Sequence, residues 1–284
     1  MKVLVTGSGG MVGTALKKVL EPEYELICPT KYQLNVCNIE AYGINESGKV
    51  DAIVHLSCET DHEYCQVNPS NAYYVNTIGT ANMVEIAERL DIPIIYVSTA
   101  SVFNGEKKKP YTTEDKPNPI NHYNKSKYYG EILTQRYEKH YILRAGWLFG
   151  GGKSIDKKFV NKIMTKVYAG HKKILVANDC IGSPTHTEDL AFAIGRILKG
   201  GRKYGIYHAV NDCQKGASRY DVAVEIKEIL KLKNVEIIPE SIDCDILKAE
   251  FPCKRTYYEV LEPNVSLRDW RVALARYLDD EYRH

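Results

Sequence analysis

The chain has 284 residues, a net charge of +2, 44% hydrophobic residues and 26% charged residues. These values are ordinary for a soluble globular protein of one large domain or two modest ones. No long basic block is present, which argues against a nucleic-acid-binding surface, and no apolar run approaches the length of a membrane span. The N-terminal stretch "MKVLVTGSGG" is a poor signal peptide, so we expect a cytoplasmic protein.

The cysteines and histidines show no pattern of a metal site. None of the eight cysteines lies in a C-x-x-C pair, and none of the eight histidines lies in an H-E-x-x-H motif. An even number of cysteines predicts disulfides mainly in small secreted chains. We therefore expect reduced, mostly buried thiols and no catalytic metal.

Short apolar runs alternate with amphipathic segments over the first half of the chain. Such runs are typical of strands that are buried on both faces of a parallel sheet. The candidate strands are residues 2–7, 25–28, 52–57, 92–99 and 141–146. The candidate helices between them are residues 11–20, 72–90 and 123–139. This alternation predicts right-handed crossovers and an α/β fold with a Rossmann-like, doubly wound parallel sheet.

After about residue 150 the alternation loosens. The candidate elements of this part are helices at 156–168, 187–199, 217–231 and 267–282, and short strands at 173–176 and 205–210. We therefore predict a sheet domain over residues 1–150. A smaller C-terminal lobe is expected over residues 151–284, with part of it returning to the sheet.

A glycine-rich turn follows the first predicted strand directly. The stretch "VTGSGGMVG" places Gly7, Gly10 and Gly13 between that strand and a helix. Gly7 permits the tight turn, Gly10 lets the backbone approach a pyrophosphate, and Gly13 lets the helix pack closely on the sheet. The free N–H groups at the helix start would bind the phosphates. This context predicts that residues 1–150 form a dinucleotide-binding domain.

The end of the second predicted strand bears on the choice of cofactor. An enzyme that uses NAD usually carries an acid there for the ribose 2′-hydroxyl, but this chain reads "ICPTKYQLNV". Thr30 and Lys31 could instead receive a 2′-phosphate, which favours NADPH. NADH stays open as an alternative.

A second glycine stretch, "FGGGKS" at 149–154, resembles the end of a phosphate-binding P-loop. The first glycine of that motif should stand at position 147, where this chain has Trp147. We therefore interpret this stretch as a turn.

Tyr123 and Lys127 lie one helical turn apart in "NHYNKSKYYGE", so they share a helix face. They follow the fourth predicted strand, which ends with the hydroxyl-bearing pair Ser98 and Thr99. The carboxyl ends of strands face the ligand in a doubly wound sheet, so these groups should meet. Tyr168 has the same spacing to a lysine but no such strand end before it, which makes it incidental.

Together these features resemble an extended short-chain dehydrogenase/reductase, and more narrowly the dTDP-4-dehydrorhamnose reductase family. The resemblance covers residues 1 to about 210 and is weaker afterwards. The stretches that carry it are "LSCETDHEYCQVNPSNAYYVNTIGT" (56–80), "PINHYNKSKYYGE" (119–131), "LRAGWLFG" (143–150) and "CIGSPTHTEDLA" (180–191).

The resemblance implies NAD(P)H-dependent reduction of the C4 keto group of a nucleotide-linked 4-keto-6-deoxy sugar, in deoxysugar biosynthesis. Tyr123 would be the acid, Lys127 would lower its pKa and hold the nicotinamide ribose, and Thr99 would bond the carbonyl oxygen. The implied cofactor contacts are Gly7, Gly10, Met11, Val12, Thr30, Lys31, Asn35, Val36, Leu56, Ser57, Cys58, Asn76, Ser98, Tyr123 and Lys127. The implied substrate contacts are Thr99, Ala100, Ser101, Trp147, Ser183 and Thr185, and the C-terminal lobe would bind the substrate.

The chain departs from the family pattern in two places. Ala100 and Ser101 stand where the family has an Asp and a Tyr, and Arg255-Thr256 stands for a family Arg-Pro. Loss of the Asp-Tyr pair predicts a roomier sugar pocket that is less selective for 4-keto-rhamnose, unless water or a residue of the second lobe fills the gap.

Other functions stay open at this point. A nucleotide-sugar 4-epimerase tolerates small residues at positions 100 and 101, and it would keep its NAD bound. A non-catalytic NADP-binding subunit that regulates a partner enzyme also uses this fold. A sugar 4,6-dehydratase is disfavoured because it needs an Asp-Glu pair at these positions. A homodimer is an open possibility.

Overall fold

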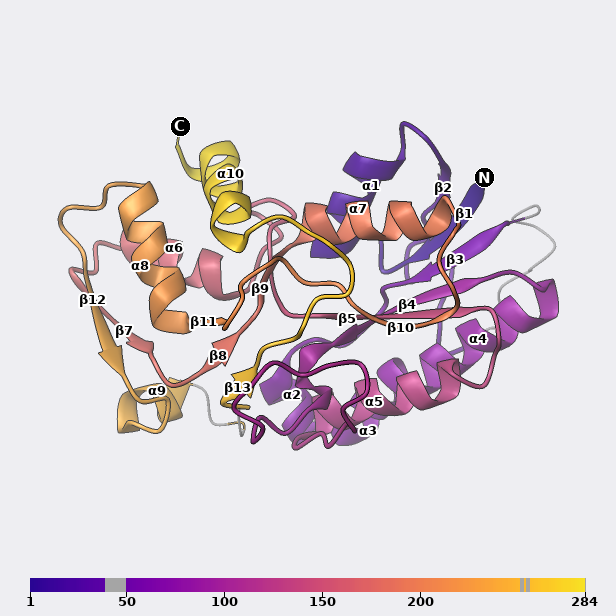
Figure 1. The fold of residues 1–284 in the computed structure, drawn as a ribbon, viewed down its shortest axis with the longest axis horizontal. Helices are drawn as coiled ribbons and strands as arrows, with labels where there is room; N and C mark the ends of the chain where they lie inside the picture. Colours follow the sequence, from indigo (N-terminus) through magenta and orange to yellow (C-terminus); the bar gives the residue numbers. More distant parts are fainter. Residues whose placement is uncertain (39–49, 251–252, 254–255, 284) are drawn as a thin grey trace.

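A parallel sheet of six strands forms the centre of the larger lobe (Figure 1). The computed structural model describes residues 1–38, 50–250, 253 and 256–283. The strand order is β10-β5-β4-β3-β1-β2, and every neighbouring pair is parallel. These strands are β1 (Lys2–Thr6), β2 (Glu25–Ile27), β3 (Ala52–His55), β4 (Ile94–Thr99), β5 (His140–Ala145) and β10 (Gly205–His208). The predicted doubly wound α/β fold is confirmed.

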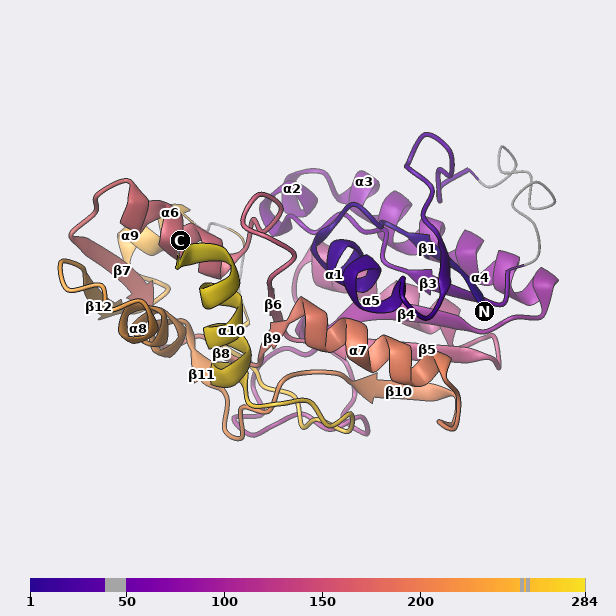
Figure 2. The same ribbon diagram turned by 90° about the horizontal axis from the view of Figure 1, so that it is seen from above.

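Helices cover both faces of this sheet, as Figures 1 and 2 show. On one face α1 (Met11–Leu20) packs beside α7 (Thr187–Leu198), and their apolar side chains join those of the sheet in one core. On the other face lie α4 (Gly79–Leu90) and α5 (His122–Thr134). Apolar side chains on both sides explain why the strands read as continuous hydrophobic runs. Within the described residues, no helix has both the length and the apolar character to cross a membrane.

The helix predicted over residues 72–90 is divided in the structure. It consists of α3 (Pro69–Tyr73), a π-helical turn η2 (Tyr74–Ile78) and α4. Just before it lies α2 (His62–Val67). The carboxylate of Asp61, the residue that precedes α2, caps the start of this helix. Because π turns widen a helix locally and are frequent at functional sites, this irregularity marks the region that faces the end of β3.

The smaller lobe has its own apolar core, built around Trp270 and Tyr277. Its helices are α6 (Phe159–Tyr168), α8 (Arg219–Ile229), α9 (Asp245–Glu250) and α10 (Trp270–Tyr282). Its strands are short: β7 (Lys173–Ala177) pairs with β12 (Glu236–Glu240), and β8 (Ile181–Gly182) lies between β11 (Ala217–Ser218) and β13 (Tyr258–Glu259). A capping box between Ser218 and Asp221 fixes the start of α8.

The chain passes between the lobes more than once. Strand β6 (Trp147–Phe149) pairs with β9 (Pro184–His186) at the junction of the lobes, seen between them in Figure 2. From there α7 and β10 return to the large sheet, where β10 pairs with β5. Part of the chain after residue 150 therefore pairs with the large sheet. The division at residue 150 and the role of the second lobe in substrate binding stay predictions.

A buried ion pair joins α5 to the sheet. The Arg144 side chain, on β5, donates to both carboxylate oxygens of Glu131, with Nη2 to Oε2 at 2.8 Å and Nε to Oε1 at 3.0 Å. Both side chains are nearly inaccessible, at 2% and 0% exposure. A buried charge without its partner is strongly destabilising, so this pair holds α5 in place.

We expect Arg144→Met to lower the free energy of unfolding by about 3–5 kcal/mol, because it leaves the Glu131 carboxylate buried and unpaired. Urea denaturation measures the loss. The matched control is Arg89→Met, which breaks the exposed i,i+4 pair with Glu85 and should cost less than about 0.5 kcal/mol. Equal, small losses in both variants would contradict the role of the buried pair.

Candidate active site

The glycine turn after β1 has the close packing that its sequence predicts. Gly7 has a φ of +68°, and a Cβ there would lie 2.7 Å from the Ser57 nitrogen. The Gly10 N–H donates to the Gly7 carbonyl at 3.1 Å. A Cβ at Gly13 would lie 2.5 Å from Ser8 Cα. Only glycine fits at positions 7 and 13, so the end of β1, the residues after β3 and the start of α1 approach closely to form a cradle.

The first turn of α1 offers its backbone N–H groups to a ligand. No side chain caps this helix, and its first turn holds no acid. Gly10 precedes Met11 and Val12 in extended conformation, so no side chain covers the N–H groups there. Such a helix start is suited to a pyrophosphate.

The second glycine stretch packs against the first. Gly150, Gly151 and Gly152 all have positive φ values, between +82° and +112°. A Cβ on Gly151 would lie 2.7 Å from Met11 Cα. The turn is therefore a close neighbour of the cradle at Gly7, and its interpretation as a turn without a phosphate of its own stays a prediction.

The end of β2 presents an exposed lysine and no acid among residues 28–38. Thr30 bonds the Gln33 side chain through its N–H and its hydroxyl, while the Lys31 ammonium lies 5.1 Å from the ring of Tyr32. Further along, Asn35 accepts from the Cys37 N–H. Val36 is buried. That Lys31 receives a 2′-phosphate stays a prediction.

The loop after β3 is fixed from two sides. Thr6 Oγ1 accepts from the N–H groups of Leu56 and Ser57 at 3.2 and 3.3 Å. Cys58 bonds the Lys127 side chain, and burial raises the pKa of its thiol. The predicted cofactor contacts at positions 56–58 therefore line the end of β3 beside the candidate lysine.

Asn76 is fully buried in η2 and supports this loop. Its Oδ1 accepts from the Glu59 N–H at 2.8 Å, and its Nδ2 donates to the Glu59 carbonyl and to Ser126 Oγ. The predicted cofactor contact thus ties the end of β3 to α5, through polar groups that already have protein partners.

Tyr123 lies where the sequence places it, at the carboxyl end of β4. Its side chain hydrogen-bonds that of Thr99, and burial raises its pKa well above the usual 10. The expected lowering of this pKa by Lys127 is wrong for the protein itself, because desolvation of the phenolate dominates. The phenol therefore stays protonated at neutral pH.

Lys127 is 3% exposed and turns toward β4 and β3. Its ammonium donates to the Val97 carbonyl at 2.9 Å and lies 4.1 Å from the centre of the Tyr96 ring. Burial lowers its pKa, and the Cys58 thiol beside it acts in the opposite direction. The ammonium thus lies among the ends of two strands, one helical turn from Tyr123.

The substrate residues predicted from the sequence lie in different surroundings. Ala100 lies in an apolar cluster with Val102 and Phe103. Ser183 and Thr185 are fully buried. The Ser183 hydroxyl accepts from the Leu261 N–H, and its carbonyl accepts from the Trp147 N–H and from the Thr185 hydroxyl. Ser183 and Thr185 therefore support the backbone behind Trp147.

Trp147 and Ser101 meet at a residue that the sequence did not single out. Glu259, on β13, accepts from the Ser101 hydroxyl at 2.6 Å and from Trp147 Nε1 at 2.7 Å. Glu259 lies within the stretch "KRTYYEVLE" (254–262). Its separation along the chain from Ser101 and from Trp147 follows no sequence motif that would predict these contacts. The second departure from the family pattern is Arg255-Thr256. Arg255 lies outside the described residues, and Thr256 is buried.

Two further residues reach the site without a sequence signal of their own. The ring of His62 lies 4.2 Å from the ring of Tyr123, centre to centre. Lys158, just before α6, donates to the Thr60 carbonyl and hydroxyl and so joins the second lobe to the loop after β3.

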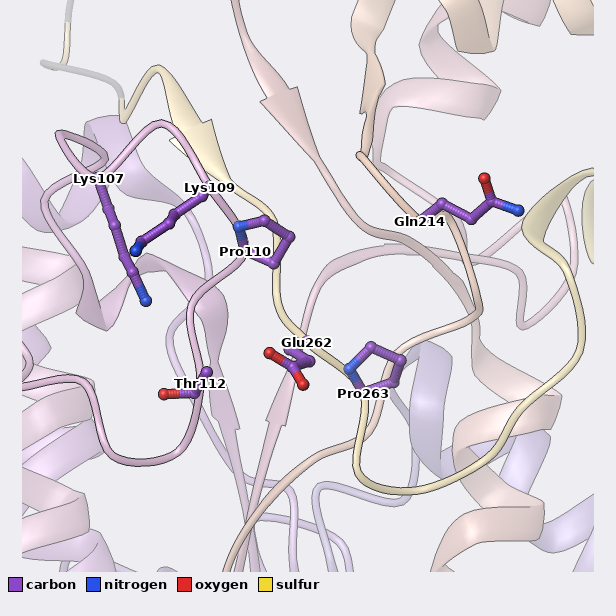
Figure 3. A pocket seen from close by; sticks show the side chains of 7 residues that line it. All are labelled: Lys107, Lys109, Pro110, Thr112, Gln214, Glu262 and Pro263. Carbon is purple, nitrogen blue, oxygen red and sulfur yellow. The ribbon is translucent and has the colours of Figure 1, made fainter.

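Figure 3 shows a pocket of about 430 Å³ whose lining includes none of these groups. None of the predicted site residues lines it. Its lining residues are Lys107, Lys109, Pro110, Thr112, Gln214, Glu262 and Pro263. The candidate active site is therefore identified by the geometry of its side chains and not by this pocket.

The described residues fit a nicotinamide dinucleotide. The cradle at Gly7 and the uncapped start of α1 suit the pyrophosphate. Ser98, beside Thr99, is 5% exposed, and its hydroxyl has no hydrogen-bond partner among the described residues. A buried hydroxyl without a partner is costly, which is consistent with a ligand contact at the end of β4.

Comparison with known proteins agrees with this geometry. The family model described as "RmlD substrate binding domain" matches residues 1–283. The chain belongs to this family. It is 30% identical to a dTDP-4-dehydrorhamnose reductase of Mycolicibacterium smegmatis, over 96% of this chain and 84% of that one.

Two solved structures of the family are closely similar in fold. A dTDP-4-dehydrorhamnose reductase from Clostridium acetobutylicum has a TM-score of 0.87 and 30% identity, over 98% of this chain and 99% of that one. The enzyme of the same name from Bacillus anthracis, solved in complex with NADP, has a TM-score of 0.87 and 27% identity at the same coverage. The resemblance seen in the sequence motifs is thereby confirmed.

We expect the protein to bind NADPH more tightly than NADH, because residues 28–38 contain no acid that would repel a 2′-phosphate beside Lys31. Lys31→Glu should weaken NADPH binding roughly tenfold or more and leave NADH binding nearly unchanged, since a charged hydrogen bond is lost. Fluorescence titration of both nucleotides measures this. Lys173→Glu, at an exposed position on β7, is the control. Tighter binding of NADH by the unaltered protein would overturn the assignment.

Proposed function

We propose that the protein reduces the C4 keto group of a nucleotide-linked 4-keto-6-deoxy sugar with NADPH, as an oxidoreductase of deoxysugar biosynthesis. The observation that carries this is the placement of the Tyr123 phenol, bonded to Thr99 beside the buried Lys127 at the carboxyl end of β4. Family membership supports the same activity. The substrate is a nucleotide sugar of the kind on which the named relatives act.

The chemistry of the step requires an acid at the carbonyl oxygen. NADPH, when bound, supplies the hydride. As the oxygen gains negative charge, it needs a donor close by. Tyr123 is suited to this by its position, because its phenol bonds the Thr99 side chain at the carboxyl end of β4. Thr99, which bonds Tyr123, is placed to donate a second hydrogen bond to the same oxygen.

Lys127 and its neighbours orient the acid. The ammonium is held by the Val97 carbonyl, which fixes the turn of α5 that carries Tyr123. The ring of His62 lies against the phenol ring of Tyr123. One face of the acid is therefore shielded from water. Desolvation of this kind strengthens a hydrogen bond to a developing oxyanion.

The direct test is NADPH oxidation with a panel of 4-keto-6-deoxy sugar nucleotides, among them dTDP-4-keto-rhamnose. We expect turnover with at least one of them and release of the oxidised cofactor. Retention of NAD through purification, with interconversion of 4-hydroxy epimers, would instead identify an epimerase. Tight NADP binding without turnover on any sugar would identify a regulatory subunit.

Tyr123→Phe should lower turnover a hundredfold or more, the usual scale for a lost general acid. Its affinity for NADPH should stay close to that of the unaltered protein, because the phenylalanine ring still packs against His62. Stopped-flow kinetics and cofactor titration separate the two effects.

The matched control for this variant is Tyr168→Phe. Tyr168 is 67% exposed at the end of α6 and has a lysine at the same spacing. Turnover should not change there. Near-normal turnover in Tyr123→Phe would remove the acid from the mechanism.

A further inference from the structure

A carboxylate from the C-terminal segment lies beside the candidate catalytic groups. Glu259, on β13, is 8% exposed. Its Oε1 accepts from the Ser101 hydroxyl at 2.6 Å and its Oε2 from Trp147 Nε1 at 2.7 Å. Ser101 belongs to η3 (Ala100–Val102), which follows β4 directly, and Trp147 begins β6. One side chain therefore bridges the end of the large sheet and the junction of the lobes.

A short chain of hydrogen bonds connects this carboxylate to the acid. The Ser101 N–H donates to Thr99 Oγ1 at 3.1 Å, and the Thr99 side chain bonds Tyr123. Ser101 thus contacts Glu259 through its hydroxyl and Thr99 through its backbone. A sugar whose keto oxygen lies against Tyr123 and Thr99 would bring its ring hydroxyls toward Ser101 and Glu259.

The carboxylate retains the capacity to bind a further donor. Each carboxylate oxygen can accept two hydrogen bonds, and each Glu259 oxygen accepts one from Ser101 or Trp147. The Trp147 ring beside the carboxylate is covered by the Arg219 guanidinium, which lies 3.7 Å from the centre of the ring. An anionic acceptor close to a half-buried indole is well suited to a neutral sugar, which offers hydroxyl donors and a weakly polar ring face.

We propose that Glu259 is a specificity-determining residue of the sugar pocket, where it accepts a hydrogen bond from a ring hydroxyl of the substrate. This rests on the proposed function, since it presumes a sugar at Tyr123. The carboxylate absent from positions 100 and 101 is thereby supplied from β13. The pocket is therefore not left without polar groups by the loss of the Asp-Tyr pair. Ser101 is hydrogen-bonded to Glu259, and Ala100 belongs to an apolar cluster.

The test compares ligands with and without the sugar. The dissociation constants of dTDP-rhamnose and of dTDP are measured by calorimetry on the NADP-saturated protein. Glu259→Gln should weaken dTDP-rhamnose binding roughly tenfold or more, as for a lost bond to a charged acceptor, and leave dTDP within twofold. A glutamine can still bond both Ser101 and Trp147, so a purely structural role would change neither constant. In turnover, KM for the sugar should rise while kcat changes little.

Two further variants complete the design. Glu259→Asp keeps the charge but withdraws it by one methylene, and it should show the same selective loss. Glu262→Gln removes an exposed carboxylate three residues away, at the pocket of Figure 3, and should change neither constant.

The outcomes separate this assignment from the proposed function. Unchanged binding in Glu259→Gln, or an equal loss for dTDP-rhamnose and dTDP, would overturn the role of Glu259 alone. If the unaltered protein binds dTDP-rhamnose no better than dTDP and oxidises NADPH with no 4-keto sugar, the proposed function fails and this inference fails with it.

Discussion

The burial of one ammonium group, that of Lys127, is the constraint on which the arrangement of the site depends. A charge in so enclosed a place must find acceptors, or it loses its proton. The Val97 carbonyl and the Tyr96 ring provide them from β4, and Cys58 provides another from the end of β3. These contacts form together only where α5 crosses both strand ends. One side chain thereby determines where this helix lies on the sheet.

A second buried charge on the same helix fixes its rotation. Glu131 follows Lys127 by one turn, so both lie on one face of α5, and Glu131 is held by Arg144 of β5. Two anchors on neighbouring strands leave α5 little freedom to roll. Tyr123, one turn before Lys127 on this face, is consequently directed at the end of β4, where it meets Thr99. The position of the acid is thus a result of two buried charged side chains on α5, Lys127 and Glu131.

The sequence was sufficient for the parts of this arrangement that depend on local periodicity. Strand–helix alternation predicted the sheet, and the spacing of Tyr123 and Lys127 behind Ser98 and Thr99 predicted the meeting of these groups. Burial is a tertiary quantity, so the direction of the Tyr123 pKa was missed. Glu259 was missed because its partners lie 112 and 158 residues away along the chain. The hydroxyls of the G-S-P-T stretch (182–185) bond nearby backbone groups, and their contact with a substrate stays a prediction.

The division of labour between the lobes follows from these contacts. The acid, the lysine and the glycine cradle all belong to the large sheet and α5, whose geometry is fixed by buried charges and close glycine packing. The carboxylate of Glu259 arrives on β13, a strand of two residues that pairs only with β8 among the described strands. The next residues are tied to the sheet lobe by the bridge between Leu261 and Tyr111. A substitution of Glu259 therefore changes a contact of the pocket while Lys127 and Glu131 still hold the helix that carries the acid. Selectivity for the sugar is separable from the hydride-transfer step for this physical reason.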